Sequence, residues 1–167
     1  MARRPNVQGE LRLVSEWLAA ERAAYWYQLR VRLGDLPKAV GSAASSDAER
    51  ELLRGAWARW ADAIVELPDR TEIIEAKMVL TPGAIAQLEL YARLLPLTPT
   101  LSHRKHLPAQ LVLLYAVPDA MVIEMAHERK IITVLYRPGW VDEWLASYAA
   151  RKHRAPLPQE TAPAAGL

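Results

Sequence analysis

The stretch that decides the fold is WADAIVELPDRTEIIEAKMV, residues 60–79. Two apolar runs rich in β-branched residues flank a Pro-Asp turn, a pattern typical of a β-hairpin. The same hairpin carries Asp62, Glu75 and Lys77 among isoleucine, valine and alanine. Because charged side chains are rarely buried unless they are paired or bind a metal, these three residues call for an explanation.

The turn predicts which residues of the hairpin face each other. If residues 67–70 form a four-residue loop around a type I turn, Glu66 pairs with Thr71. Counting back along both strands then puts Asp62 directly opposite Glu75. The Cβ atoms of such a pair are roughly 5 Å apart, a distance at which two negative charges repel each other.

A divalent cation would resolve the repulsion between Asp62 and Glu75. Hard oxygen ligands favour Mg²⁺ or Mn²⁺ over zinc. Lys77 shares a strand face with Glu75 and would stabilise developing negative charge or orient a water molecule. The alternative is a solvated strand face, which is the better interpretation of a Glu-x-Lys pair taken alone. Asp62 fits that alternative poorly, because aspartate is disfavoured in strands.

The rest of the chain predicts the elements around this hairpin. Apolar periodicity and capping signals indicate helices at 8–24, 47–55, 81–95, 119–130 and 139–153, and strands at 26–33, 109–117 and 131–136. The hairpin implies antiparallel pairing, whereas the late strand–helix–strand unit implies a parallel pair with a right-handed crossover. We therefore expect one α/β domain over residues 1–154, with a mixed sheet of about five strands flanked by helices. Residues 155–167 are expected to be a Pro/Ala-rich tail.

The spacing of Asp62 and Glu75-Ala76-Lys77 resembles the PD-(D/E)XK motif of a nuclease superfamily, with Ala61 in place of the proline. The order of predicted elements from residue 8 to 117, about two-thirds of the chain, is similar to the restriction-endonuclease-like core of that superfamily. The resemblance implies that Asp62, Glu75 and the Ala76 carbonyl bind Mg²⁺ (or Mn²⁺). It also implies that Lys77 assists catalysis.

Two further features belong to this resemblance. Gln87 and Tyr91 match the Gln-x-x-x-Tyr motif of exonuclease-type members, which implies that they position the lysine or the substrate strand. In isolation, residues one turn apart are more simply helix-surface or core residues. Members often add an acid from the first helix. Glu21 is expected in that role because it continues the apolar stripe of that helix, with Glu16 as the alternative.

Charge and composition limit the ways in which the chain can contact a partner. The net charge is only +2, so DNA contacts must come from local patches, and we expect Arg104, Lys105, Arg151 and Lys152 to supply them. Stacking of a base on Trp57 or Trp60 is a less favoured alternative to a core role. The absence of cysteine excludes disulfides and thiolate zinc sites. No apolar run is long enough for a transmembrane helix, and we expect a cytoplasmic protein, whether of cellular or viral origin.

The sequence thus predicts a metal-dependent DNA nuclease that hydrolyses phosphodiester bonds at Asp62, Glu75 and Lys77. The alternative is a catalytically inactive, nuclease-fold structural or interaction module in a viral or multiprotein assembly, such as a homo-oligomer. The low net charge and the lack of a second domain to supply specificity keep that alternative open.

Overall fold

The structure is a computed structural model and describes residues 5–36, 45–57 and 59–153. It divides into two compact units, residues 1–137 and 138–167. The second unit contains helix α6 (Trp140–His153), in which the rings of Trp144 and Tyr148 stack with their centroids 5.1 Å apart. The predicted tail at 155–167 lies outside the described residues. None of the described helices is long and apolar enough to cross a membrane.

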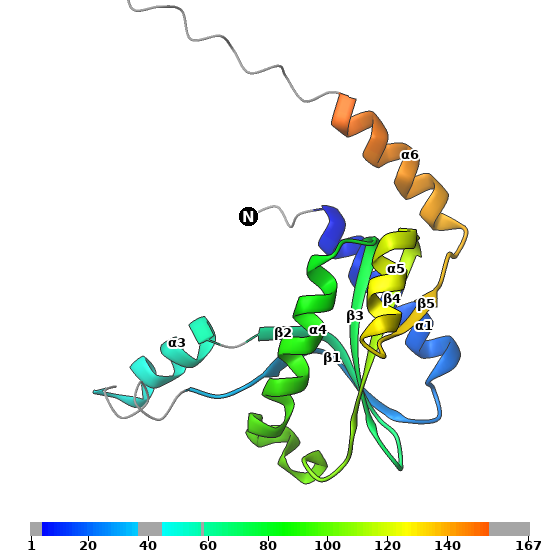
Figure 1. Ribbon diagram of the computed structural model, residues 1–167. Helices are drawn as coiled ribbons and strands as arrows, with labels where there is room; N and C mark the ends of the chain where they lie inside the picture. The colour runs from blue at the N-terminus through cyan, green and yellow to red at the C-terminus, as the bar shows by residue number, and fades with distance from the viewer. Residues whose placement is uncertain (1–4, 37–44, 58, 154–167) are drawn as a thin grey trace, which may run out of the picture. The chain divides into compact units, whose positions relative to one another are not determined.

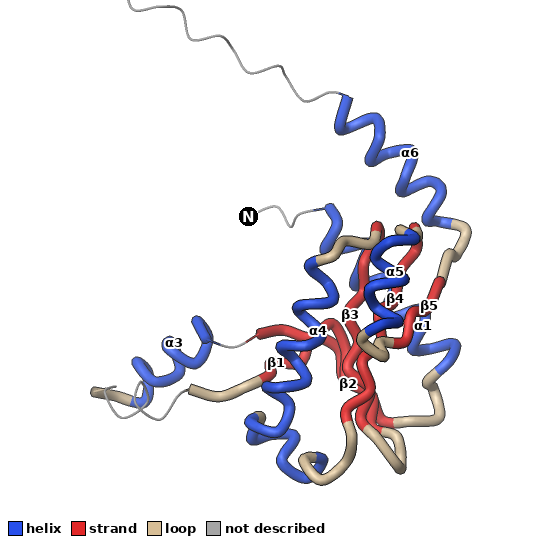
Figure 2. Tube along the Cα trace, viewed as in Figure 1, coloured by secondary structure: helices blue, strands red, loops and turns tan. Residues whose placement is uncertain are grey.

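The first unit is an α/β fold built on one mixed sheet (Figures 1 and 2). Its strands are β1 (Trp26–Leu33), β2 (Arg59–Glu66), β3 (Thr71–Val79), β4 (Ala109–Val117) and β5 (Ile132–Leu135). Its helices are α1 (Pro5–Glu21), α3 (Asp47–Trp57), α4 (Gly83–Leu94) and α5 (Ala120–Glu128), with 3-10 turns η1 (Leu95–Leu97) and η2 (Pro99–Arg104). The predicted elements are all present, with ends shifted by a few residues.

The five strands lie in the order β1-β2-β3-β4-β5, which confirms the predicted sheet. β1, β2 and β3 are antiparallel neighbours, while β3, β4 and β5 run parallel. The hairpin turn is the predicted four-residue loop: Glu66 pairs with Thr71, and the N–H of Leu67 donates to the carbonyl of Arg70 at 3.0 Å. The turn therefore sets the register that carries Asp62 towards Glu75.

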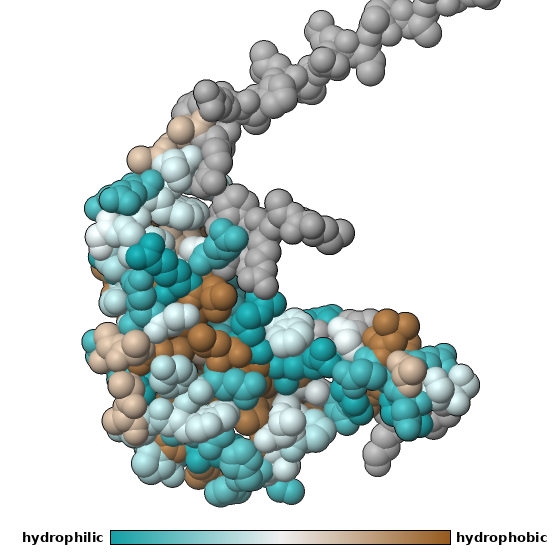
Figure 3. Space-filling model, turned by 180° about the vertical axis from the view of Figure 1, so that it is seen from behind, coloured by the Kyte–Doolittle hydropathy of each residue, from teal (hydrophilic) through white to brown (hydrophobic). Residues whose placement is uncertain are grey.

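Helices cover both faces of the sheet, with α1 on one face and α4 and α5 on the other (Figure 1). Ile73 of β3 and Leu113 of β4 are fully buried and form a core with Leu88 and Tyr91 of α4. The carboxylate of Asp119 caps α5 by accepting from two backbone N–H groups. Burial on both faces explains why β4 is almost continuously apolar. The surface in Figure 3, seen from behind, mixes hydrophilic residues with small hydrophobic patches.

Arg104, which we expected to contact DNA, holds the hairpin turn instead. Its guanidinium donates to the carbonyls of Leu67 and Arg70 and, at 3.2 Å, to the hydroxyl of Thr71. The side chain is only 13% exposed. Because its donors are already used by the backbone, we remove Arg104 from the expected DNA surface.

Replacing Arg104 with alanine should lower the free energy of unfolding by about 1–3 kcal/mol, because buried hydrogen-bond acceptors in the turn lose their donor. Urea denaturation measures the change, with Lys105→Ala as the matched control. Lys105 is an exposed neighbour, and its substitution should change stability by no more than about 0.5 kcal/mol. Equal unfolding midpoints for the two variants would show that the turn does not depend on the hydrogen bonds from Arg104.

Candidate functional site

The candidate site lies where the regular strand pairing is interrupted. The β1–β2 ladder runs on both sides of the position where Arg30 would face Asp62, but it omits that pair. Arg30 has a φ of 51°, a left-handed conformation that non-glycine residues rarely adopt. The β2–β3 ladder ends at Ala63 and Ile74, one position before Asp62 and Glu75. Regular strand pairing is therefore interrupted around Asp62 and Glu75.

The two carboxylates have different partners. Asp62 Oδ2 accepts a hydrogen bond from the backbone N–H of Ala76 at 2.8 Å. Glu75 is 2% exposed, and its Oε1 is in close contact with the ammonium group of Lys77. Glu75 Oε2 is buried and has no hydrogen-bond partner in the described part of the chain. An unpaired oxygen on a buried carboxylate is costly, which makes Glu75 a candidate for ligand binding. The Tyr91 side chain also lies close enough for a hydrogen bond with the Glu75 carboxylate to contribute to the raised pKa of Tyr91.

The charges of these residues influence one another. Burial raises the pKa of Glu75 to about 7; the charge of Asp62 adds to this, and Lys77 opposes it. Burial also raises the pKa of Asp62, although the N–H of Ala76 and the charges of Lys77 and Arg30 act to lower it. For Lys77, burial acts to lower the pKa, but the acids around it, Glu75 first, hold it above its ordinary value. Perturbed groups of this kind gather at functional sites more often than elsewhere.

The acid that α1 contributes is Glu10, and the expectation for Glu21 is wrong. Burial raises the pKa of Glu10, while Lys77 acts to lower it and Asp62 to raise it, so Glu10 belongs to the same cluster. Glu21 is exposed at the other end of α1, about three turns away. Glu16, the alternative, pairs with Arg12 at 2.8 Å. The sequence pattern predicts an acid at the C-terminal end of the apolar stripe. Glu10 instead lies towards the N-terminal end of that stripe, one turn before Val14.

Helix α4 brings the predicted Gln87 and Tyr91 to the cluster. The hydroxyl of the buried Tyr91 donates to the backbone carbonyl of Trp60 at 2.7 Å, two residues before Asp62. Burial raises the pKa of Tyr91, and the charges of Glu75 and Asp62 raise it further. Gln87 is exposed and interacts with the Tyr91 side chain. Tyr91 therefore ties α4 to the strand that carries Asp62.

The donors in this cluster fit a hard divalent cation in chemical type, because they are carboxylate oxygens and one of them is unpaired. Their present arrangement is not a complete coordination shell. Within residues 5–36, 45–57 and 59–153, no three histidine, cysteine or acidic side chains are grouped closely enough to hold a metal. Lys77 supplies the positive charge beside Glu75 instead. A metal ion bound here would require the side chains around Glu75 Oε2 to rearrange.

Of the other expected DNA contacts, only Lys105 has a described side chain. Lys105 is exposed on the loop after η2. The side chains of Arg151 and Lys152 lie outside the described residues, as does the side chain of Trp57. The described arginine that sequence reasoning missed is Arg30, whose charge acts on Asp62. No sequence pattern marks it, because its position depends on the left-handed backbone at that residue.

Comparison with known proteins gives a distant structural likeness. No family model matches the chain, and no curated protein matches it. Among solved structures, the chain is similar to the crystal structure of AF1548, a protein of unknown function. The two share 12% identity with a TM-score of 0.46, over 84% of this chain and 66% of that one. The chain thus spans slightly less than two-thirds of AF1548.

Proposed function

We propose that this protein is a metal-dependent nuclease that hydrolyses phosphodiester bonds in DNA. The observation that carries the proposal is the buried cluster of Asp62, Glu75 and Lys77, with an unpaired oxygen on Glu75. A structural domain gains little from such a cluster, because buried charges destabilise a fold unless they are fully paired. The resemblance to the PD-(D/E)XK motif supports the same reading of these three residues.

In this proposal Asp62 and Glu75 hold Mg²⁺ (or Mn²⁺), with Ala76 contributing its carbonyl oxygen. When bound, the ion lowers the pKa of a water molecule and polarises the scissile phosphate. In the hydrolysis, a water oxygen bonds to phosphorus, the P–O bond to the leaving oxygen breaks, and that oxygen gains a proton. Lys77 is placed to offset the negative charge that builds up on the phosphate.

The neighbouring residues position this group. Tyr91 holds the β2 backbone through the carbonyl of Trp60, and Gln87 reaches Tyr91 from the exposed side of α4. Glu10 places a third carboxylate within the field of Lys77 and Asp62. A negative charge there favours the protonated, cationic form of Lys77, which is the form that stabilises a phosphate.

The proposal is tested by incubating the purified protein with linear duplex, circular duplex and single-stranded DNA, in Mg²⁺ and in chelator. We expect cleavage of at least one of these DNA forms in Mg²⁺, and no cleavage in chelator. If the wild-type protein leaves all three DNA forms intact in both Mg²⁺ and Mn²⁺, the proposal is wrong.

Metal binding should be detectable as a gain in thermal stability in the absence of DNA. We expect Mg²⁺ to raise the melting temperature, because the unfolded chain does not hold both carboxylates together. At a concentration about 100 times its Kd, the gain is about 2.7 kcal/mol. The gain should be larger at about pH 8 than at about pH 5.5, because Glu75, with a pKa of about 7, must lose its proton before it binds a cation.

Asp62→Asn should abolish this gain, whereas Glu66→Gln on the same strand should retain it, since Glu66 pairs with His103 away from the cluster. Differential scanning calorimetry measures both variants. A gain of equal size in wild type and in Asp62→Asn would place the metal elsewhere.

The rival proposal is a nuclease-like fold that serves as a structural or interaction module. Its supporting observation is that Lys77 already neutralises Glu75, while the described acids form no three-ligand group. It differs from the nuclease in one measurable respect: it requires the wild-type protein to be inactive in every metal.

A further inference from the structure

Lys77 is a cation that the three acids of the cluster share. Against the effect of burial, its charge acts to lower the pKa of Glu75, of Asp62 and of Glu10. Its ammonium group is in contact with Glu75 Oε1, and its side chain is 18% exposed. The positive charge that the cluster needs therefore comes from a side chain that reaches solvent.

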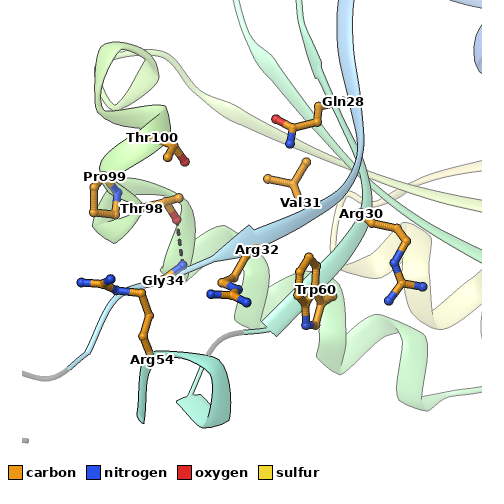
Figure 4. Close-up of a pocket in the computed structure, with 10 residues that line it drawn as sticks. All are labelled: Gln28, Arg30, Val31, Arg32, Gly34, Arg54, Trp60, Thr98, Pro99 and Thr100. Carbon is orange, nitrogen blue, oxygen red and sulfur yellow. Dashed lines mark hydrogen bonds between the residues drawn. The ribbon is translucent and has the colours of Figure 1, made fainter. Parts of the chain in front are cut away.

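Arg30 is a second cation near the cluster, but an aromatic ring holds it. Its charge also acts to lower the pKa of Asp62, against the effect of burial. Its guanidinium carbon lies 5.6 Å from the ring centroid of Trp60, and Figure 4 shows the two side chains next to each other. A cation–π contact of this kind keeps the guanidinium beside the ring. Of these two cations, Lys77 is the one in contact with a carboxylate of the cluster.

The contact with Lys77 uses only one of the two oxygens of Glu75. The other, Oε2, is buried and has no hydrogen-bond partner in the described part of the chain. A divalent cation that binds this carboxylate would lie close to the ammonium group, and two positive charges so close together repel each other. Because a buried carboxylate needs a positive partner, Glu75 can exchange one cation for another but cannot give up both.

We propose that Lys77 and a divalent cation exchange at Glu75, and that a DNA phosphate drives the exchange by binding the ammonium group. The inference rests on the proposed nuclease function and adds regulation to it: the metal binds weakly to the free protein and more tightly once DNA is bound. Coupling between two ligands is reciprocal, so the metal must tighten DNA binding by the same factor, typically about 5- to 150-fold. The metal centre would then form mainly where a phosphate is present.

The first test measures metal binding without DNA. Isothermal titration calorimetry with Mg²⁺ compares wild type with Lys77→Met, at about pH 9 so that protons compete less for Glu75. The variant has no ammonium group for the metal to displace, so it should bind Mg²⁺ at least about 5-fold more tightly than wild type. If Lys77 only holds Glu75 in place, its loss should weaken Mg²⁺ binding instead.

The matched control is Lys130→Met, which removes the same charge from an exposed lysine after α5 and should bind Mg²⁺ like wild type. Thermal melting shows whether each variant is folded. Lys77→Gln keeps a hydrogen-bond donor but loses the charge, so it should also bind Mg²⁺ more tightly than wild type. It decides the question if Lys77→Met is not folded.

The second test measures the coupling to DNA. Fluorescence anisotropy gives the Kd of a labelled DNA hairpin with a single-stranded tail, in chelator and in Ca²⁺ at equal ionic strength, and gel electrophoresis shows that the DNA stays intact. Ca²⁺ is used in place of Mg²⁺ because it is also a hard cation that prefers oxygen ligands. It should tighten DNA binding by wild type about 5- to 150-fold, and by Lys77→Met by a smaller factor, because no lysine is released to the phosphate.

Two results would overturn the inference: Mg²⁺ binding by Lys77→Met that is no tighter than that of wild type, or equal tightening of DNA binding by Ca²⁺ in both proteins. The nuclease proposal fails separately, in the cleavage assay. Active wild type with either of these two results would contradict only the exchange. Inactive wild type with tighter Mg²⁺ binding by Lys77→Met would support the exchange and contradict the nuclease.

Discussion

Replacing Lys77 with alanine should reduce metal-dependent DNA cleavage by about 10²–10³-fold while the protein stays folded. The ammonium group of Lys77 touches Glu75, and its side chain is 18% exposed, so it can reach a phosphate bound at the cluster. Without it, no positive charge beside Glu75 offsets the charge that develops during hydrolysis. Single-turnover cleavage measures the rate, and thermal melting shows that the fold is retained.

Lys77→Met separates charge from packing, because methionine keeps most of the aliphatic stem and removes only the ammonium. It should lose as much activity as Lys77→Ala. If Lys77→Met cleaves nearly as fast as wild type, the lysine acts through packing, and its assigned role in charge stabilisation is wrong.

The free energy of unfolding of the wild type should fall as the pH rises, and Glu75→Gln should remove most of that fall. The pKa of Glu75 is about 7 in the folded protein and 4.5 ordinarily, so between these values the folded state keeps a proton that the unfolded state releases. Folding is therefore favoured fully at low pH, and that contribution is lost as the pH rises to about 7. At about 1.36 kcal/mol for each pKa unit, roughly 3 kcal/mol disappears between about pH 5 and pH 8.

Urea denaturation at both pH values, in chelator, measures this difference. Glutamine has no proton to lose, so the difference in unfolding free energy between the two pH values should shrink by about 3 kcal/mol in Glu75→Gln. Glu89→Gln, an exposed acid of α4 that pairs with Arg129, serves as the control and should keep the wild-type dependence. Identical pH dependence in wild type and Glu75→Gln would mean that the carboxylate of Glu75 is not held in the buried, charged environment described above.

The fold could be predicted from the sequence because its signals are local. The turn at Pro68-Asp69 sets the hairpin register, and the apolar run at 109–117 indicates a strand buried on both faces. The same turn predicts that Asp62 faces Glu75, although the β2–β3 ladder ends one position before these two residues. These features depend on residues close together in the chain, where propensity and periodicity carry most of their information.

The composition of the cluster was harder to predict because it depends on how distant elements pack. Which end of α1 lies near Lys77 is decided by the direction of that helix across the sheet, so the apolar stripe alone predicts Glu21 rather than Glu10. Arg104 looked like part of a basic patch, but the hairpin turn uses its donors. Arg30 lies over the ring of Trp60 and its charge acts on Asp62, and its left-handed backbone is not revealed by a sequence pattern.

The central claim is that Asp62 and Glu75 form one metal-dependent catalytic centre with Lys77. Its most direct test is the rate of Mg²⁺-dependent DNA cleavage by Asp62→Asn, measured beside wild type and Glu66→Gln prepared in the same way. We predict that wild type and Glu66→Gln cleave at similar rates, and that Asp62→Asn, although folded, is slower by about two orders of magnitude or more. Cleavage by Asp62→Asn at the wild-type rate, or no cleavage by the wild type, would contradict the claim.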